Sequence, residues 1–188
     1  TLLKLSRFGS NFGTSPPQCY NDSMDQDIKK GILRAKELLN TCRHAAMATV
    51  NEDGSPHNTP FRFIHDPKLK YVYWGSYQES AHSLNVLRTG KIFVVLYEGK
   101  EKGGLYIKAE GGQELAGKEL EEGLALFNSI RAIAGEHVLL LDYYIGNAPQ
   151  RLWRAKITNL YINGVDRDKN GHVAKDWRKE ISVQDLLE

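Results

Sequence analysis

The sequence predicts a mainly β fold, a small antiparallel barrel with peripheral helices, and residues 45–97 carry this prediction. Runs rich in aromatic and β-branched residues alternate with turn signals over this stretch, as in KYVYW at residues 70–74. Asp53-Gly54 and Asp66-Pro67 are typical of tight turns between neighbouring strands. The run KIFVVLY at residues 91–97 completes a meander of short strands.

A short helix interrupts this meander, because the apolar period changes after the strand YVYWG. Leu84 and Leu87 lie at helical spacing, and Gly90 is suited to end the helix as a C′ residue. Ser76, followed by Glu79, fits a capping box, which predicts that the helix starts directly after the strand.

The strand at residues 91–97 is apolar on both of its faces. Strand side chains alternate, so one face carries Ile92, Val94 and Leu96 and the other carries Phe93, Val95 and Tyr97. A strand of this kind must be covered twice. In a short meander the second cover is often another protomer, so we expect a homodimer formed through one wall of the barrel.

Ser76, Ser80 and His82 are candidates for an anion site at the start of the short helix. A helix N-terminus has unpaired N–H groups and a partial positive charge, which favour a phosphate group, and the serine hydroxyls add donors. The alternative is that the serine only caps the helix and that the histidine is solvated. Spacing alone does not separate these interpretations.

The order of these motifs resembles the FMN-binding split-barrel family typified by pyridoxamine 5′-phosphate oxidase. The resemblance rests on SPHNTPF, the aromatic strand ending Trp-Gly-Ser, ESAHSLNVLRTG and KIFVVLYE, and it covers roughly residues 45–115. It implies a homodimeric, antiparallel split β-barrel with FMN in the cleft between the subunits.

The resemblance also implies which residues contact the cofactor. Ser76 matches the hydroxyl at the strand end, Ser80 matches the serine of the phosphate motif, and His82 stands where the family usually has lysine. A neutral imidazole at His82 brings no full charge at pH 7. The affinity for phosphate should therefore depend more on the serines, the helix N-terminus and Arg62. The strand residues implied to lie near the flavin are Pro60, Phe61, Arg62 and Trp74.

In the family the last strand reaches the flavin site of the other subunit with an aromatic residue and an arginine. Trp153 and Arg151, with Arg154 beside them, are the matching residues here. The alternative is that the tryptophan belongs to the core and that the arginines pair with acids such as Glu136 or Asp142. The chain ends Asp-Leu-Leu-Glu, unlike the closing Arg-Leu-x-Pro-like segment of true pyridoxamine phosphate oxidases, which argues against the vitamin B6 reaction.

The remaining chain is organised around this central stretch. Residues 1–23, rich in Gly, Pro, Ser and Asn, predict an extended arm or leader, and residues 24–188 predict one domain. Residues 138–144 fit either the end of a helical hairpin or a short buried strand. The other expected elements are a helix over 25–42, a strand over 105–113 with a bulge at Gly111-Gly112, a helix over 118–134, a strand over 151–163 closed by a hairpin turn at Asn163-Gly164, and a charged tail over 165–188.

Composition excludes several classes of function. A net charge of +2 on 188 residues is too mild for a nucleic-acid partner, and no apolar run reaches the length of a membrane span. The two cysteines form no metal or redox spacing, which indicates free thiols in a reducing cytoplasm, and the histidines show no ligand spacing for a metal.

No catalytic residues stand out, so the chemistry of an enzyme would belong to its cofactor. The first hypothesis is an FMN-dependent oxidoreductase acting on an unidentified small molecule, and a variant of it replaces FMN with a deazaflavin. The second hypothesis is a non-catalytic carrier or sensor of flavin or haem. His57, Arg62, Tyr77 and Trp153 are the residues expected around an open face of the flavin.

Overall fold

The computed structural model of the protein describes residues 18–98, 103–168 and 170–188, which form eight strands and five helical segments. In chain order the elements are α1 (Gln18–Thr41), β1 (His44–Val50), β2 (Pro56–Arg62), β3 (Ile64–His65), β4 (Tyr71–Tyr77), α2 (Ala81–Thr89), β5 (Ile92–Leu96), β6 (Leu105–Glu114), α3 (Gly117–Ile133), the 3₁₀ turn η1 (Leu141–Tyr143), β7 (Gln150–Arg167), β8 (Val173–Ile181) and α4 (Val183–Leu187).

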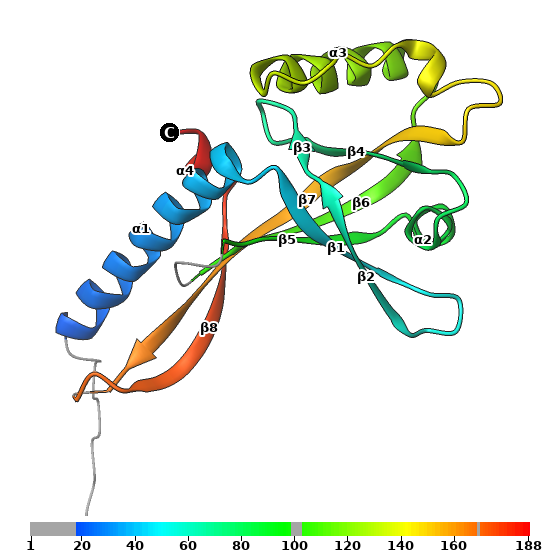
Figure 1. Ribbon diagram of the computed structural model, residues 1–188. Helices are drawn as coiled ribbons and strands as arrows, with labels where there is room; N and C mark the ends of the chain where they lie inside the picture. Colours follow the sequence, from blue (N-terminus) through cyan, green and yellow to red (C-terminus); the bar gives the residue numbers. More distant parts are fainter. Residues whose placement is uncertain (1–17, 99–102, 169) are drawn as a thin grey trace, which may run out of the picture.

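The strands form one antiparallel sheet in the order β2-β1-β5-β6-β7-β4-β3, with β8 added to β7 (Figure 1). The first and last strands of this order do not pair, so the sheet curls into a barrel that stays open along one seam. β7 holds the sheet together, because it pairs with β6 along one edge and with β4 and then β8 along the other. The predicted mainly β, antiparallel split-barrel fold with peripheral helices is therefore confirmed.

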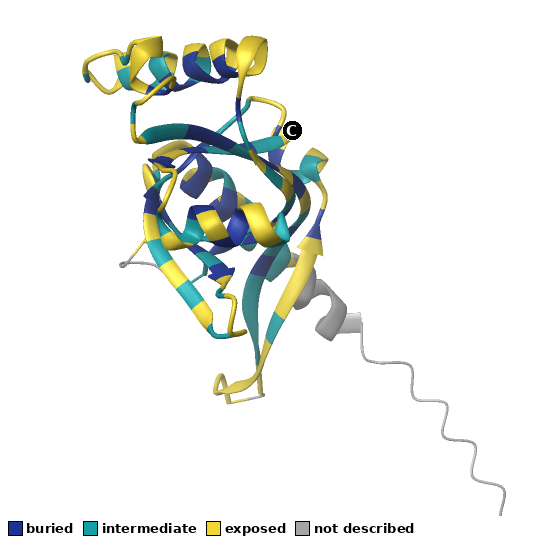
Figure 2. Ribbon diagram, turned by 90° about the vertical axis from the view of Figure 1, so that its right-hand side faces the viewer, coloured by how far each residue is buried: buried dark blue, intermediate teal, exposed yellow. Residues whose placement is uncertain are grey.

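The main core fills the interior of the barrel, and each strand contributes alternate residues to it. On β5, Ile92, Val94 and Leu96 point inward and are buried, as the alternation predicts. Seen from the side of α2, the strands surround the core and α2 lies across the opening (Figure 2). α1 packs along β7 and brings Ala35, Leu38 and Leu39 to the same core.

A second core lies between α3 and the outer face of the sheet (Figure 1). Leu120, Leu124 and Phe127 of α3 pack there against Ile64 and Leu152, which point away from the barrel interior. Gly123 allows this close approach, since a Cβ atom at this position would lie 2.7 Å from Leu115 Cδ1. The packing of α3 against the sheet therefore compensates for the glycine within this helix.

Several local predictions are confirmed. The chain reverses at Gly54, where Asn51 N–H donates to the Ser55 carbonyl, and Gly90 ends α2 with φ 65° and an N–H bond to the Val86 carbonyl. The register of β6 against β7 shifts between Glu110 and Gln113, which places the bulge at the two expected glycines.

The predicted capping box is wrong. The N-cap of α2 is Ser80 instead of Ser76, and no side chain caps the helix. β4 continues to Tyr77, and a turn over residues 78–80 precedes the helix. The hydroxyl of Ser76 stays on the strand and is therefore free to take part in other contacts.

The hairpin turn predicted at Asn163-Gly164 is also wrong. β7 runs on to Arg167, and the turn that leads to β8 is built around Asp168, whose carboxylate accepts the N–H groups of Asn170 and His172. Gly164 serves a packing purpose instead, because the Trp177 ring of β8 lies directly against it.

The helix predicted from residue 25 begins earlier, at Gln18, so the last residues of the expected arm belong to α1. Residues 1–17 of that arm lie outside the described residues. Of the two alternatives for residues 138–144, neither a strand nor a full helix forms, and the segment holds the short turn η1 before β7.

Candidate functional site

Three predicted site residues, Ser76, Ser80 and His82, form one hydrogen-bonded cluster. Ser76 Oγ lies 2.6 Å from His82 Nε2, and Ser80 Oγ lies 3.2 Å from the same nitrogen. The two hydroxyl oxygens are 3.0 Å apart. The cluster therefore gathers two hydroxyl groups and one imidazole at the junction of β4 and α2, where the first turn of the helix exposes backbone N–H groups.

The turn over residues 78–80 holds this cluster in place. Ser80 Oγ donates to the Tyr77 carbonyl at 2.9 Å and lies 2.8 Å from Ser83 Oγ. Ser83 is buried, as is Asn85, whose amide donates to Thr49 Oγ1 and Asn51 Oδ1 on the β1–β2 hairpin. These contacts fix α2 against the barrel. Sequence reasoning missed Ser83 and Asn85, because it took Leu84 and Leu87 as the stripe of the helix, and the structure exposes both leucines.

His57 of β2 also joins the cluster. Its ring stacks on that of His82, with 6.3 Å between ring centroids and 18° between planes. Burial, together with the neighbouring His57, lowers the pKa of His82 below its usual value of 6.5, so this imidazole is neutral at pH 7. Without a ligand the cluster therefore offers hydrogen bonds and carries no fixed positive charge on His82.

Arg62 does not lie at the cluster. It follows the alternation of β2 to the outer face of the sheet, whereas His57 and Phe61 point inward. Both of its terminal nitrogens bind Glu136, at 2.8 and 2.7 Å, and Arg131 binds the same carboxylate at 3.0 Å. These arginines lower the pKa of Glu136. Arg62 thus holds the chain after α3 against β2.

Arg151 is the cation nearest to Ser76 by strand register, since the two residues pair directly between β4 and β7. Its donors are committed to neighbouring groups. Nε binds Glu114 at 2.9 Å, and the terminal nitrogens donate to the carbonyls of Gly146, Ala148 and Gln150. Arg151 therefore anchors the loop before β7, and Glu114, which sequence reasoning missed, is its acidic partner.

The predicted aromatic site residues belong to the barrel core. Trp74 and Trp153 are fully buried, pair in register between β4 and β7, and stack with 6.3 Å between ring centroids. Phe61 packs edge-on against Trp74. Pro60 lies exposed on the outer face of β2. Of the alternatives for β7, the structure shows Trp153 in the core and both arginines paired with acids. The acids are not the suggested Glu136 and Asp142, because Arg151 binds Glu114 and Arg154 binds Glu119.

The outer face of β5 has no second layer among the described residues. Phe93 and Val95 are half-buried there, and Tyr97 is 64% exposed. Arg178 of β8 lies over the Tyr106 ring at 3.9 Å and near that of Phe93, but it covers only one end of the face. The apolar outer face of β5, which suggested a partner subunit, is therefore accessible to a second subunit.

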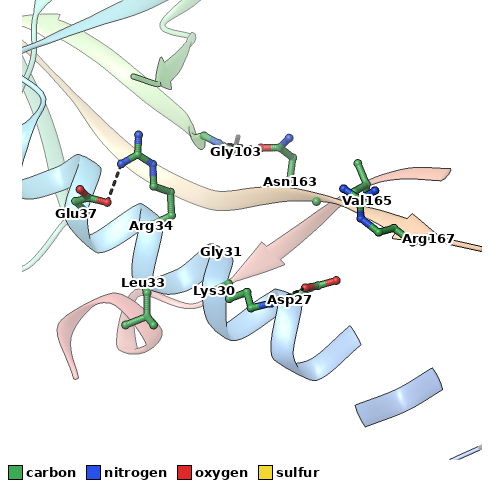
Figure 3. A pocket seen from close by; sticks show the side chains of 12 residues that line it. Asp27, Lys30, Gly31, Leu33, Arg34, Glu37, Gly103, Asn163, Val165 and Arg167 are labelled. Atoms are coloured by element: carbon green, nitrogen blue, oxygen red, sulfur yellow. Dashed lines mark hydrogen bonds and ion pairs between the residues drawn. The ribbon is translucent and has the colours of Figure 1, made fainter. Parts of the chain in front are cut away.

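A cavity of about 600 Å³ lies elsewhere, between α1 and the end of β7 (Figure 3). Its lining holds two ion pairs: Lys30 lies 3.6 Å from Asp27, and Arg34 binds Glu37 at 2.7 Å. The cavity does not include the Ser–His cluster, so volume alone does not identify the site.

The described part of the chain holds no group of three or more His, Cys, Asp or Glu side chains that could bind a metal ion. Among its helices, none has the length and apolar character needed to cross a membrane.

The profile of the family described as pyridoxamine 5′-phosphate oxidase matches residues 34–164, which include the whole Ser–His cluster. No curated protein matches this chain in sequence.

Similar solved structures share the fold at low sequence identity. A heme binding protein from Mycobacterium smegmatis has a TM-score of 0.58 and 12% identity over 84% of this chain and 60% of that chain. A protein related to general stress protein 26 from Clostridium acetobutylicum, of the pyridoxinephosphate oxidase family, has a TM-score of 0.55 and 13% identity over 81% and 96%. HutZ, the heme storage protein from Vibrio cholerae, has a TM-score of 0.51 and 15% identity over 66% and 89%. These similarities concern the fold alone.

Proposed function

Because the chain belongs to the pyridoxamine 5′-phosphate oxidase family, we propose that it binds FMN and acts as a flavin-dependent oxidoreductase on a small molecule. The observation that carries the proposal is the cluster of Ser76, Ser80 and His82 at the start of α2. In this proposal the cluster holds the phosphate group of FMN.

The cluster fits a phosphate through its hydrogen-bond donors. A phosphate has several acceptor oxygens. The hydroxyl oxygens of Ser76 and Ser80 lie 2.6 and 3.2 Å from His82 Nε2, at the start of a helix whose first N–H groups have no partner within the helix. The neighbouring arginines make other contacts, so the fit does not depend on them. Bound FMN would supply the redox chemistry, and this chain's residues would anchor it and orient its ring.

The proposal includes a homodimer that covers the open outer face of β5. Half-buried Phe93 and Val95 with exposed Tyr97 form an apolar strip there, and an equivalent strip on a second copy would bury it. Cys42 is a free thiol, which suits a reducing cytoplasm.

Haem binding is the second candidate, and it follows from similarity of fold. Similar structures include a heme binding protein and a heme storage protein. In this alternative the protein carries or stores its ligand and no flavin chemistry is needed.

An absorption spectrum and a titration separate the candidates. We expect purified protein, stripped of bound cofactor, to quench the fluorescence of FMN with saturation and to bind riboflavin, which lacks the phosphate, much more weakly. A Soret band on adding haem, with no response to FMN, would support the carrier. Saturable binding of a deazaflavin, with no binding of FMN, would support a reductase that uses a deazaflavin in place of FMN.

A further inference from the structure

We propose that binding of a phosphate group at Ser76, Ser80 and His82 is coupled to the uptake of one proton by His82, so that affinity for phosphorylated ligands rises as the pH falls. The inference rests on the proposed function, because it concerns how the same cluster compensates the ligand's charge.

The arginines around the cluster are bound to other groups. Arg62 is bound by Glu136 on the other side of the sheet, and Arg151 is bound by Glu114 and three carbonyl groups. Arg88, at the far end of α2, donates to the Val50 carbonyl. None of these arginines contacts the serine hydroxyls of the cluster, so among the described residues there the imidazole of His82 is the group placed to offset the charge of a phosphate.

Other groups also face α2, which packs against β1, β2 and β6. β2 presents His57, and β1 presents the uncharged Thr49. On β6, Lys108 and Glu110 bind each other at 3.0 Å, and Glu114 is held by Arg151. Glu79 and Tyr77, beside the helix start, are exposed. Of all these groups only His57 acts on the pKa of His82, and it lowers that pKa along with burial.

The hydrogen bonds of the cluster depend on the protonation of His82. In the tautomer in which Nε2 carries no hydrogen, this nitrogen accepts the single hydroxyl hydrogen of Ser76 across 2.6 Å, so that hydrogen cannot reach a ligand. Protonated His82 carries a hydrogen on both ring nitrogens, so Nε2 donates to Ser76 Oγ and the Ser76 hydrogen is released toward a phosphate oxygen. From that tautomer, one added proton therefore brings a positive charge and also frees a donor.

The ligand itself drives this change. An anion close to the imidazole favours its charged form and so opposes the effects of burial and of His57. Where free His82 is neutral and bound His82 is protonated, linkage predicts up to about a tenfold gain in affinity for each pH unit of acidification.

The test measures the Kd of FMN by fluorescence quenching between about pH 7 and pH 8.5, where a phosphate ester with a second pKa of about 6 is already mostly a dianion. We expect affinity to rise several-fold toward pH 7, while riboflavin binding stays flat. Calorimetry in two buffers of different protonation enthalpy should show net proton uptake. Sulfate, whose charge is constant here, should compete better at the lower pH.

Two variants locate the proton. His82→Lys carries a permanent charge and should bind FMN with little pH dependence, whereas His82→Gln should bind more weakly, also with little pH dependence. His57→Gln is the matched control, and it should keep the pH dependence, since it leaves His82 in place and removes a neighbour that lowers the pKa of His82. Circular dichroism confirms that each variant is folded.

The possible failures are distinguishable. FMN binding to the wild type that is tight and independent of pH, with no proton uptake, would overturn this inference and leave the proposed function standing. A wild type that binds no FMN at any pH would overturn the proposed function. A pH dependence that persists in His82→Lys would assign the proton to another group and also overturn the inference.

Discussion

Ser76 Oγ of β4 lies 2.6 Å from His82 Nε2 of α2, and this contact joins the end of a core strand to the start of the helix that covers the barrel opening. Ser76 is buried and stays on the strand, while His82 approaches it from the first turn of α2. The geometry of the site therefore depends on the turn over residues 78–80, which Ser80 holds through the Tyr77 carbonyl.

Removing the hydroxyl of Ser76 should weaken FMN binding. A hydrogen bond to a charged group contributes about 1.5–3 kcal/mol, so Ser76→Ala is expected to raise the Kd roughly 10- to 100-fold. Fluorescence titration measures the change. Ser129→Ala is the matched control, because Ser129 is exposed on α3 and should leave the Kd unchanged. Equal affinity in both variants would remove Ser76 from the phosphate site.

The ion pairs of Glu136 should make stability depend on pH in the acid range. Arg62 and Arg131 lower the pKa of Glu136 below 4.5, so its contribution is fully present above the unfolded value and is lost as the pH falls through the lower, folded value. Glu136→Gln should therefore have a lower melting temperature than the wild type at neutral pH, and this difference should shrink at acid pH. Glu121→Gln, on the exposed side of α3, should melt at the same temperature as the wild type. A difference in melting temperature for Glu136→Gln that is the same at every pH would contradict this account.

Gly164 should be intolerant of a side chain. A Cβ atom there would lie 2.1 Å from Trp177 Cζ2, and crowding of this kind costs about 1–3 kcal/mol. Gly164→Ala should lower the melting temperature. Trp177→Ala removes the obstacle, so in the double variant the added methyl group should cost much less than it does in the wild type. Purely additive effects of the two substitutions would show that contact with Trp177 does not cause the destabilisation by Gly164→Ala.

Phe127 anchors α3 on the outer face of the sheet, where it is buried in the second core. Phe127→Ala should lower the free energy of unfolding by about 3–5 kcal/mol, since the substitution leaves a cavity around which the core relaxes only in part. Denaturant titration measures this loss. Leu126→Ala, at a half-buried position of the same helix, should cost clearly less.

Val95, on the outer face of β5, reports on the proposed homodimer. A lysine at this half-buried position would place a charge within the apolar strip, so Val95→Lys should shift the mass by light scattering from about twice 21.2 kDa toward the monomer. Val173→Lys on exposed β8 is the control and should remain dimeric. A wild type that is monomeric at all concentrations would contradict the homodimer.

The sequence by itself determined several local features of the protein, although the capping box predicted at Ser76 and the turn predicted at Asn163-Gly164 were wrong. The turn at Gly54, the helix end at Gly90 and the bulge at Gly111-Gly112 all lie where the residues predict them. Each depends on contacts among residues close in the chain or on glycine's backbone freedom. The strand alternation likewise predicted the buried face of β5. Together these signals were sufficient for the fold class and for the neighbourhood of Ser76, Ser80 and His82.

Only the tertiary structure decided which distant residues meet. Arg62 and Glu136 are 74 positions apart, and their pairing depends on how the chain after α3 returns across β2. His57 contacts His82 because β1 and β2 pack against α2. Arg151 binds Glu114 because the register of β6 against β7 places the two residues near each other. Sequence pattern specifies the face of a strand but not its partner across the barrel. For that physical reason the residues predicted near the cofactor divide between the Ser–His cluster, the barrel core and ion pairs that hold the loops.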